Sequence, residues 1–217
     1  MFNQPFTLSQ VRPIRDAMTV SRPAQLGREV PVTWFSLGAG TSITPESYDC
    51  TTLYLSGEGT GDFILGEDGR SVSVHPGQLL AVPSKTLCGT RTDSGMIYTE
   101  IILKKENYTM NSIIKAGQPT ELKSLISYEE GSIANLDLVR ADNMKFVLMA
   151  FDEGTGLTPH RAPGNAILTA LEGKAIIGYE GKDYELNAGE SFRFDKNGLH
   201  SVTPQGKFKM SLLLVLE

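Results

Sequence analysis

The chain has 217 residues, 40% of them hydrophobic and 21% charged, which is enough for one large or two small domains with a buried core. Its 25 acidic and 20 basic residues give a net charge of −5, which argues against nucleic-acid binding because such proteins usually carry a basic excess. The sequence shows no signal peptide, no apolar stretch long enough to cross a bilayer and only two cysteines. We therefore expect a cytoplasmic protein with no membrane partner and no disulfide framework.

Strand signals dominate the N-terminal half. Apolar or alternating runs separated by Gly-rich turns predict strands at residues 51–55, 61–65, 70–74, 78–82 and 96–103. Asp68-Gly69 is a hairpin turn between two of these runs, because both residue types tolerate positive φ.

The second half repeats this rhythm. Strands are predicted at residues 145–151, 166–171, 174–179, 182–186, 190–194 and 207–216. The only helices we expect are short segments around residues 121–125 and 11–19. The sequence therefore predicts an all-β fold.

An internal repeat connects the two halves. Residues 40–45 (GTSITP) match residues 154–159 (GTGLTP), and further matches pair Leu55-Ser56-Gly57 with Leu171-Glu172-Gly173 and Leu87-Cys88 with Leu199-His200. Two copies of one β unit are the simplest explanation. We place the N-terminal copy at residues 1–106, a linker with a short helix at 107–131, and the C-terminal copy at 132–217.

The C-terminal copy resembles the cupin superfamily at both of its sequence signatures. The first signature, two histidines followed by a glutamate and a glycine, corresponds to residues 160–173, and the second, which ends in a third histidine, to residues 189–200. The run of residues 149–163 is similar to small bacterial and archaeal bicupins that keep a His-x-x-Pro pattern in place of the full metal motif. The resemblance implies two tandem jelly-roll barrels, the double-stranded β-helix or RmlC-like fold, in a protein that is often a homodimer.

The resemblance also implies a metal site that is incomplete here. His160 and His200 fall on the first and last ligand positions of the family, whereas Ala162 and Ala166 stand where the second histidine and the glutamate belong. Imidazole would suit one divalent transition metal, namely Zn, Fe, Ni or Mn. Asp195 is the nearest third ligand in sequence. The alternative is a metal-free pair of histidines that bind each other, water or an organic ligand.

The N-terminal copy carries a different set of residues at these positions. Glu46 and Cys88 match His160 and His200 in the repeat, and Cys50 is assigned to the glutamate position. A thiolate site follows as one hypothesis, either for a soft metal or as a redox-responsive pair. The alternative is that both cysteines are small buried side chains of the core.

These residues lead to three hypotheses on function. The first is a non-catalytic or weakly catalytic protein that binds a small molecule in the C-terminal barrel, because the mouths of β-barrels are common ligand sites. A metal-dependent enzyme of the dioxygenase or isomerase type is the second, and a structural protein that dimerises through its N-terminal barrel is the third. By strand alternation, the wall of the ligand pocket is predicted to include Leu168, Ala170, Phe194 and Met210.

Overall fold

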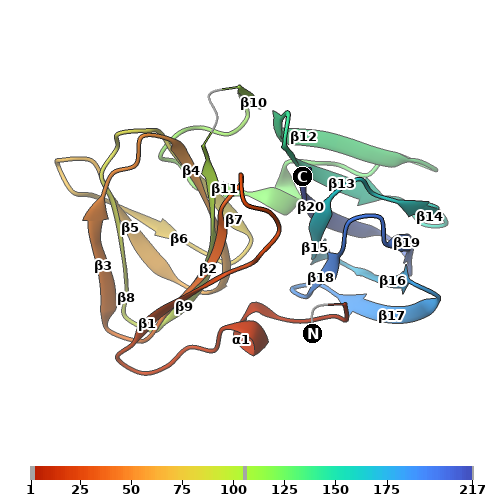
Figure 1. Cartoon of the computed structure of the whole chain (residues 1–217), viewed down its shortest axis with the longest axis horizontal. Coiled ribbons are helices and arrows are strands. Elements are labelled where there is room, and N and C mark those ends of the chain that lie inside the picture. Colours follow the sequence, from red (N-terminus) through yellow and green to blue (C-terminus); the bar gives the residue numbers. More distant parts are fainter. Residues whose placement is uncertain (1–2, 105–106, 217) are drawn as a thin grey trace. The chain divides into compact units, whose positions relative to one another are not determined.

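The chain folds almost entirely into β-strands. Figure 1 shows its computed structural model, which describes residues 3–104 and 107–216. The described residues form two compact units. The N-terminal unit contains residues 8–104, 107–108 and 112–121, and the C-terminal unit contains residues 3–7, 109–111 and 122–216.

The N-terminal unit consists of two antiparallel sheets. The larger sheet has the strand order β1-β2-β9-β4-β7-β11, and its strands are β1 (Thr19–Pro23), β2 (Val32–Leu37), β4 (Thr51–Gly59), β7 (Gln78–Val82), β9 (Met96–Leu103) and β11 (Thr120–Glu121). The smaller sheet has the order β3-β8-β5-β6, with β3 (Thr41–Glu46), β5 (Gly61–Leu65), β6 (Arg70–Val74) and β8 (Cys88–Thr92). A single helical turn, α1 (Leu8–Val11), precedes them.

Aromatic residues fill the space between these two sheets. Tyr54 packs against Phe63 and Tyr98 at ring-centroid distances of 4.9 and 5.7 Å, and Phe35 stacks on Tyr98 at 5.2 Å. Such rings bury large apolar areas and account for much of the stability of a core.

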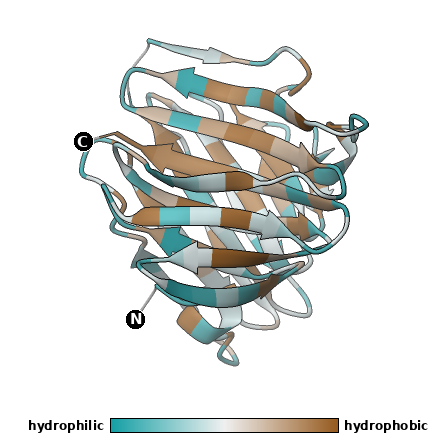
Figure 2. Ribbon diagram, turned by 90° about the vertical axis from the view of Figure 1, so that its right-hand side faces the viewer, coloured by the Kyte–Doolittle hydropathy of each residue, from teal (hydrophilic) through white to brown (hydrophobic). Residues whose placement is uncertain are grey.

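The C-terminal unit repeats the same plan. Its larger sheet has the order β10-β12-β13-β20-β15-β18, with β10 (Tyr108–Met110), β12 (Ile133–Ala141), β13 (Met144–Phe151), β15 (Asn165–Glu172), β18 (Ser191–Phe194) and β20 (Phe208–Val215). Its smaller sheet has the order β14-β19-β16-β17, with β14 (Leu157–Arg161), β16 (Lys174–Tyr179), β17 (Lys182–Asn187) and β19 (Leu199–Pro204). Figure 2 shows hydrophobic and hydrophilic residues interleaved along the strands, as expected for sheets with one face on a core. The predicted all-β fold of two tandem cupin-type barrels is confirmed.

The expected strands are present, and the structure adds others that sequence reasoning missed, among them β2, β3, β8, β12, β14 and β19. The predicted helix at residues 121–125 is a single 3₁₀ turn, η1 (Leu122–Ser124). The predicted helix at residues 11–19 is wrong, because α1 ends at Val11. Pro13 explains this end: proline lacks the amide donor and disfavours helical geometry in the residue before it.

Strand pairing corrects the register of the internal repeat. A β-bulge lies between Ser56 and Glu58 in the N-terminal unit and between Ala170 and Glu172 in the C-terminal unit. Gly59 and Gly173 follow these bulges with φ of 68° and 75°. Gly59, rather than Gly57, is therefore the counterpart of Gly173.

This correction moves Cys50 within the repeat. A two-residue change of register places Thr52 at the position of Ala166 and Cys50 at that of Gly164. Cys50 therefore does not occupy the glutamate position that the sequence match assigned to it.

The predicted domain boundaries remain a proposal. Contacts group residues 3–7 with the C-terminal unit and residues 112–121 with the N-terminal unit. The proposed boundary at residue 106 lies outside the described residues. In residues 3–104 and 107–216, no helix is long and apolar enough to span a membrane.

Candidate functional site

Two histidines meet at one edge of the C-terminal barrel. His160 on β14 lies directly opposite His200 on β19, and their ring centroids are 4.3 Å apart. His200 is buried, with 6% of its surface exposed, whereas His160 is exposed. The pair therefore reaches from the barrel interior to solvent.

Each imidazole is held in the same way by the backbone carbonyl two residues earlier. His160 Nδ1 lies 2.8 Å from the carbonyl oxygen of Thr158, and His200 Nδ1 lies 2.9 Å from that of Gly198. A carbonyl can only accept, so each Nδ1 carries the proton and donates it. In the neutral ring this leaves Nε2 with its lone pair for a ligand, the arrangement that also orients metal-binding histidines.

The surroundings of His200 favour its neutral form. The Phe194 ring stacks on the imidazole with centroids 4.1 Å apart and planes 18° apart. Burial lowers the pKa of His200, the hydrogen bond to Gly198 opposes this shift, and the nearby His160 adds to it. At neutral pH, His200 is therefore a hydrogen-bond acceptor through Nε2.

The donor set does not fit a metal site with three protein ligands. Ala166 pairs with Phe194 inside the core and offers no donor atom. The Asp195 carboxylate accepts hydrogen bonds from Asn3 and Arg193, at 2.9 and 3.1 Å. No group of three His, Cys, Asp or Glu side chains suited to a metal occurs in the part of the chain that the structure describes. Two histidines are the protein donors that this edge provides.

The four predicted pocket residues belong to the packed core of the C-terminal barrel. Leu168, Ala170, Phe194 and Met210 are each at most 1% exposed and share one hydrophobic cluster. Leu168 and Ala170 are two residues apart on β15, and both are buried in this cluster. A ligand at the histidine pair would therefore contact the barrel edge above these residues.

The N-terminal barrel brings together only two of its three predicted site residues. Glu46 on β3 lies opposite Cys88 on β8, the position that His160 and His200 occupy in the other copy. Cys50 lines a separate hollow of about 290 Å³ with Asp49, Thr51, Ser84, Leu103, Lys104 and Tyr108. Neither cysteine forms a disulfide. Burial raises the pKa of Cys88 to about 11, so its thiol is protonated at neutral pH.

Glu46 and Cys88 border a small internal cavity. Its volume is about 40 Å³, and it is lined by Phe35, Ile43, Thr44, Glu46, Tyr48, Tyr54, Cys88, Gly89, Thr90, Tyr98 and Glu100. Sequence reasoning missed Glu100, which is 7% exposed. Its signal was a single carboxylate inside the apolar strand 96–103 (MIYTEIIL), where a charged residue is costly to bury. Burial raises the pKa of Glu100 to about 7, and a hydrogen bond with Tyr54 opposes the shift.

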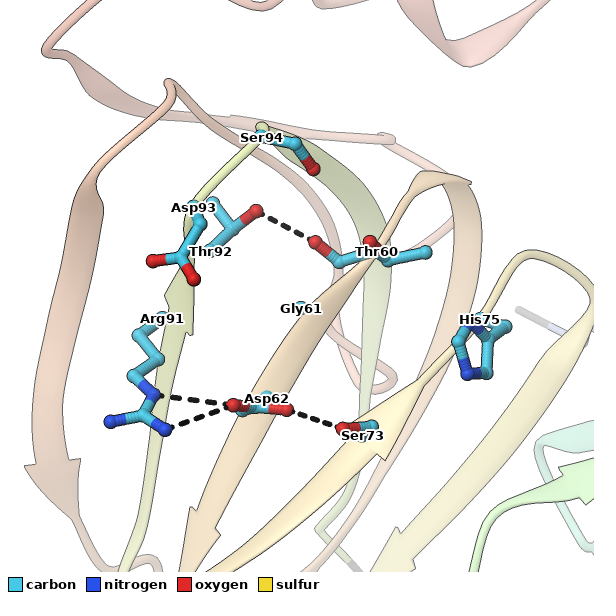
Figure 3. A pocket seen from close by; sticks show the side chains of 9 residues that line it. All are labelled: Thr60, Gly61, Asp62, Ser73, His75, Arg91, Thr92, Asp93 and Ser94. Atoms are coloured by element: carbon cyan, nitrogen blue, oxygen red, sulfur yellow. Dashed lines mark hydrogen bonds and ion pairs between the residues drawn. The ribbon is translucent and has the colours of Figure 1, made fainter.

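A further hollow lies on the smaller sheet of the N-terminal unit (Figure 3). It has a volume of about 150 Å³, and the Asp62 side chain lies between those of Arg91 and Ser73. Asp62 accepts hydrogen bonds from Ser73 Oγ at 2.6 Å and from Arg91 Nη2 at 3.0 Å. His75 is exposed at another side of this hollow. Because the Asp62 carboxylate is already paired with Arg91, this hollow is a weaker candidate than the two barrel interiors.

Comparisons with known proteins agree with this architecture. Residues 147–216 match the family described as "Cupin domain", and no curated protein matches the sequence of the chain. A cupin 2 conserved barrel domain protein from Leptotrichia buccalis superposes with a TM-score of 0.85 at 24% identity, over 99% of this chain and 97% of that one. A salicylate 1,2-dioxygenase from Pseudaminobacter salicylatoxidans superposes with a TM-score of 0.69 at 12% identity, over 98% of this chain and 83% of that one. The same dioxygenase with gentisate superposes with a TM-score of 0.68 at 12% identity, over 98% and 80% of the two chains. Residues 147–216 therefore form a cupin domain, and nearly the whole chain has the two-barrel cupin fold.

Proposed function

We propose that this protein binds a small organic molecule at the edge of its C-terminal barrel, with His160 and His200 as the polar contacts. The observation that carries the proposal is the matched orientation of the two rings: each Nδ1 is bound to the carbonyl two residues earlier, so both Nε2 atoms are left to a ligand. Orientation before binding lowers the entropy lost when a ligand docks.

The chemistry of the pair indicates the class of ligand. Neutral His200 accepts a hydrogen bond, so the ligand offers a hydroxyl or N–H donor. The buried Phe194 ring stacks on the imidazole and fixes its orientation. A small hydroxylated ring compound supplies the donor that His200 requires. Salicylate and gentisate are suitable first probes, because one structural neighbour is a salicylate 1,2-dioxygenase and was studied with gentisate.

Titration calorimetry at pH 7.5 tests this proposal with each probe. The His160→Ala, His200→Ala double variant is expected to bind each probe at least tenfold more weakly than the wild type. The His75→Ala variant, which is changed in the other barrel, is the control and should keep wild-type affinity. Equal affinity of the double variant and the wild type would overturn the assignment of the site. Nuclear magnetic resonance of the two imidazoles would show directly whether a probe reaches them.

A metal-dependent cupin enzyme is the second candidate function. The juxtaposition of His160 and His200 favours it, but a metal there would need further ligands from the substrate or solvent, since three protein ligands are usual in catalytic sites. Elemental analysis of protein purified without an affinity tag tests it. Near-stoichiometric Zn, Fe, Ni or Mn that disappears in the double variant would establish this alternative. Equal trace metal in both proteins would reject it.

Dimerisation through the N-terminal barrel stays a prediction. A measurement of the molecular mass in solution checks it.

A further inference from the structure

The N-terminal barrel buries a carboxylate that its fold does not need. Glu100 on β9 lies opposite Tyr54 on β4. At the equivalent place in the C-terminal barrel, Leu168 lies opposite Leu212, so the same sheet is built there with two leucines. Burying a carboxylate is costly, and side chains of that kind are usually retained where they contact a partner.

The wall around Glu100 supplies no positive charge. The described residues that line the cavity include a second carboxylate, Glu46, but no lysine, arginine or histidine. A buried carboxylate is normally paired with a cation or a metal. Tyr54 gives Glu100 a hydrogen bond but no positive charge, so the counter-ion that this wall lacks would be a cation supplied from outside.

A buried hydroxyl group, that of Thr90, also lines the cavity. Thr90 is 3% exposed, and its hydroxyl oxygen makes no hydrogen bond within residues 3–104 and 107–216. The Tyr98 hydroxyl lies near Thr90. Native structures satisfy most buried hydroxyls, so an unsatisfied one that lines a cavity indicates room for a bound group.

The rings of the wall suit an organic cation better than a metal ion. Phe35, Tyr54 and Tyr98 surround the cavity together with Tyr48, and aromatic faces attract ammonium groups. A metal would need several donor atoms, yet no three-donor cluster occurs in the described part of the chain. The volume of about 40 Å³ exceeds the ~10–15 Å³ that one water needs. A group of a few heavy atoms therefore fits.

We propose that the lumen of the N-terminal barrel binds the ammonium group of a small organic amine, with Glu100 as its counter-ion and the surrounding tyrosine rings as its cage. Glu46 and Tyr48 are exposed and border the entrance. Glu46 adds negative charge at this entrance. This site is independent of the histidine pair in the other barrel.

Ligand-observed saturation-transfer NMR tests this proposal with methylammonium and its neutral counterpart methanol, at equal ionic strength and pH 8. Saturation transfer is expected to methylammonium and not to methanol. The Glu100→Gln variant, which keeps the shape of the side chain, is expected to weaken methylammonium binding at least tenfold. Glu67→Gln, an exposed change in the same barrel, is the matched control and should bind as wild type does.

The response to pH provides a second readout that needs no variant. Binding is expected to fall at least fivefold between pH 8 and pH 5.5 as Glu100 takes up a proton. Glu46, Tyr48, Tyr54, Cys88 and Tyr98 are the other titratable groups that line the cavity. Burial raises the pKa of the three tyrosines and of Cys88, so these groups stay protonated over that range, and Glu46→Gln tests whether the second carboxylate contributes to binding. Equal transfer to methylammonium and methanol, or unchanged binding by Glu100→Gln, would overturn the proposal. If Glu100→Gln does not fold, an equal effect of methylammonium and sodium on the wild-type melting temperature would overturn it.

Discussion

The Phe194 ring stacks on the His200 imidazole, with 4.1 Å between the ring centroids. This contact fixes the inner member of the histidine pair, whereas His160 at the outer end is exposed. The two histidines therefore contribute differently to stability although they lie side by side.

His200→Ala is expected to lower the free energy of unfolding by about 1–3 kcal/mol, because it leaves a gap beside Phe194. His160→Ala is expected to change it by less than about 0.5 kcal/mol, as for most exposed sites. Urea unfolding followed by circular dichroism measures both. Trp34 lies in the N-terminal unit, so its fluorescence in the folded protein, without urea, should change little in either variant. Equal losses from the two substitutions would contradict the structure.

The two cysteines are expected to react at different rates. Burial raises the pKa of Cys88 to about 11, and only the thiolate attacks a maleimide. At pH 7.5, Cys88 should therefore label at least tenfold more slowly than Cys50. The Cys50→Ser and Cys88→Ser variants assign the two phases. Rapid labelling of Cys88 in the native protein would restore the hypothesis of a reactive thiol in this barrel.

Glu100 is expected to make stability depend on pH. Its carboxyl ionises near pH 4.5 in the unfolded chain, whereas burial raises its pKa to about 7 in the folded protein. Between these values the folded state binds more protons, so the free energy of unfolding falls as the pH rises from about 4.5 to about 7. The loss from this group is roughly 3 kcal/mol at most. Glu100→Gln should remove that part of the slope. Urea unfolding midpoints of the wild type and of Glu100→Gln, measured from pH 4.5 to 8, check this. If the two proteins show the same dependence of the midpoint on pH, Glu100 ionises normally in the folded protein.

Gly173 is expected to resist substitution more than a glycine of similar backbone geometry. Gly173 and Gly181 have φ of 75° and 79°, but a β-carbon at Gly173 would lie 2.2 Å from the carbonyl oxygen of Lys207, while one at Gly181 meets nothing within 4 Å. Gly181→Ala should lower the free energy of unfolding by about 1 kcal/mol, because alanine is strained in a left-handed backbone conformation. Gly173→Ala should lower the free energy of unfolding by at least about 2 kcal/mol more, because the backbone at Lys207 must move away from the new β-carbon. Thermal unfolding of the two variants compares them directly, and equal shifts would show that the bulge can relax.

The architecture was accessible from the sequence because it depends on local patterns. Two-residue alternation, glycine turns and the repeated GT-x-x-TP segments are properties of short stretches, and they predicted strands and two copies of one unit. The histidine pair was accessible for the same reason, since His160 and His200 fall on two spaced signatures. In the structure these two residues lie opposite each other on β14 and β19.

The chemistry of the barrel interiors was decided by tertiary structure. A β-bulge changes the register by whole residues, and residue types do not reveal it, so Cys50 was assigned to a position that Thr52 occupies. Glu100 sits in an apolar strand whose sequence does not say which residues face it. Only pairing across β3, β4, β8 and β9 places Tyr54, Cys88 and Glu46 around the same cavity. Local periodicity thus determined which segments are strands, whereas contacts between distant strands decided which side chains share a site, because those contacts depend on register and burial.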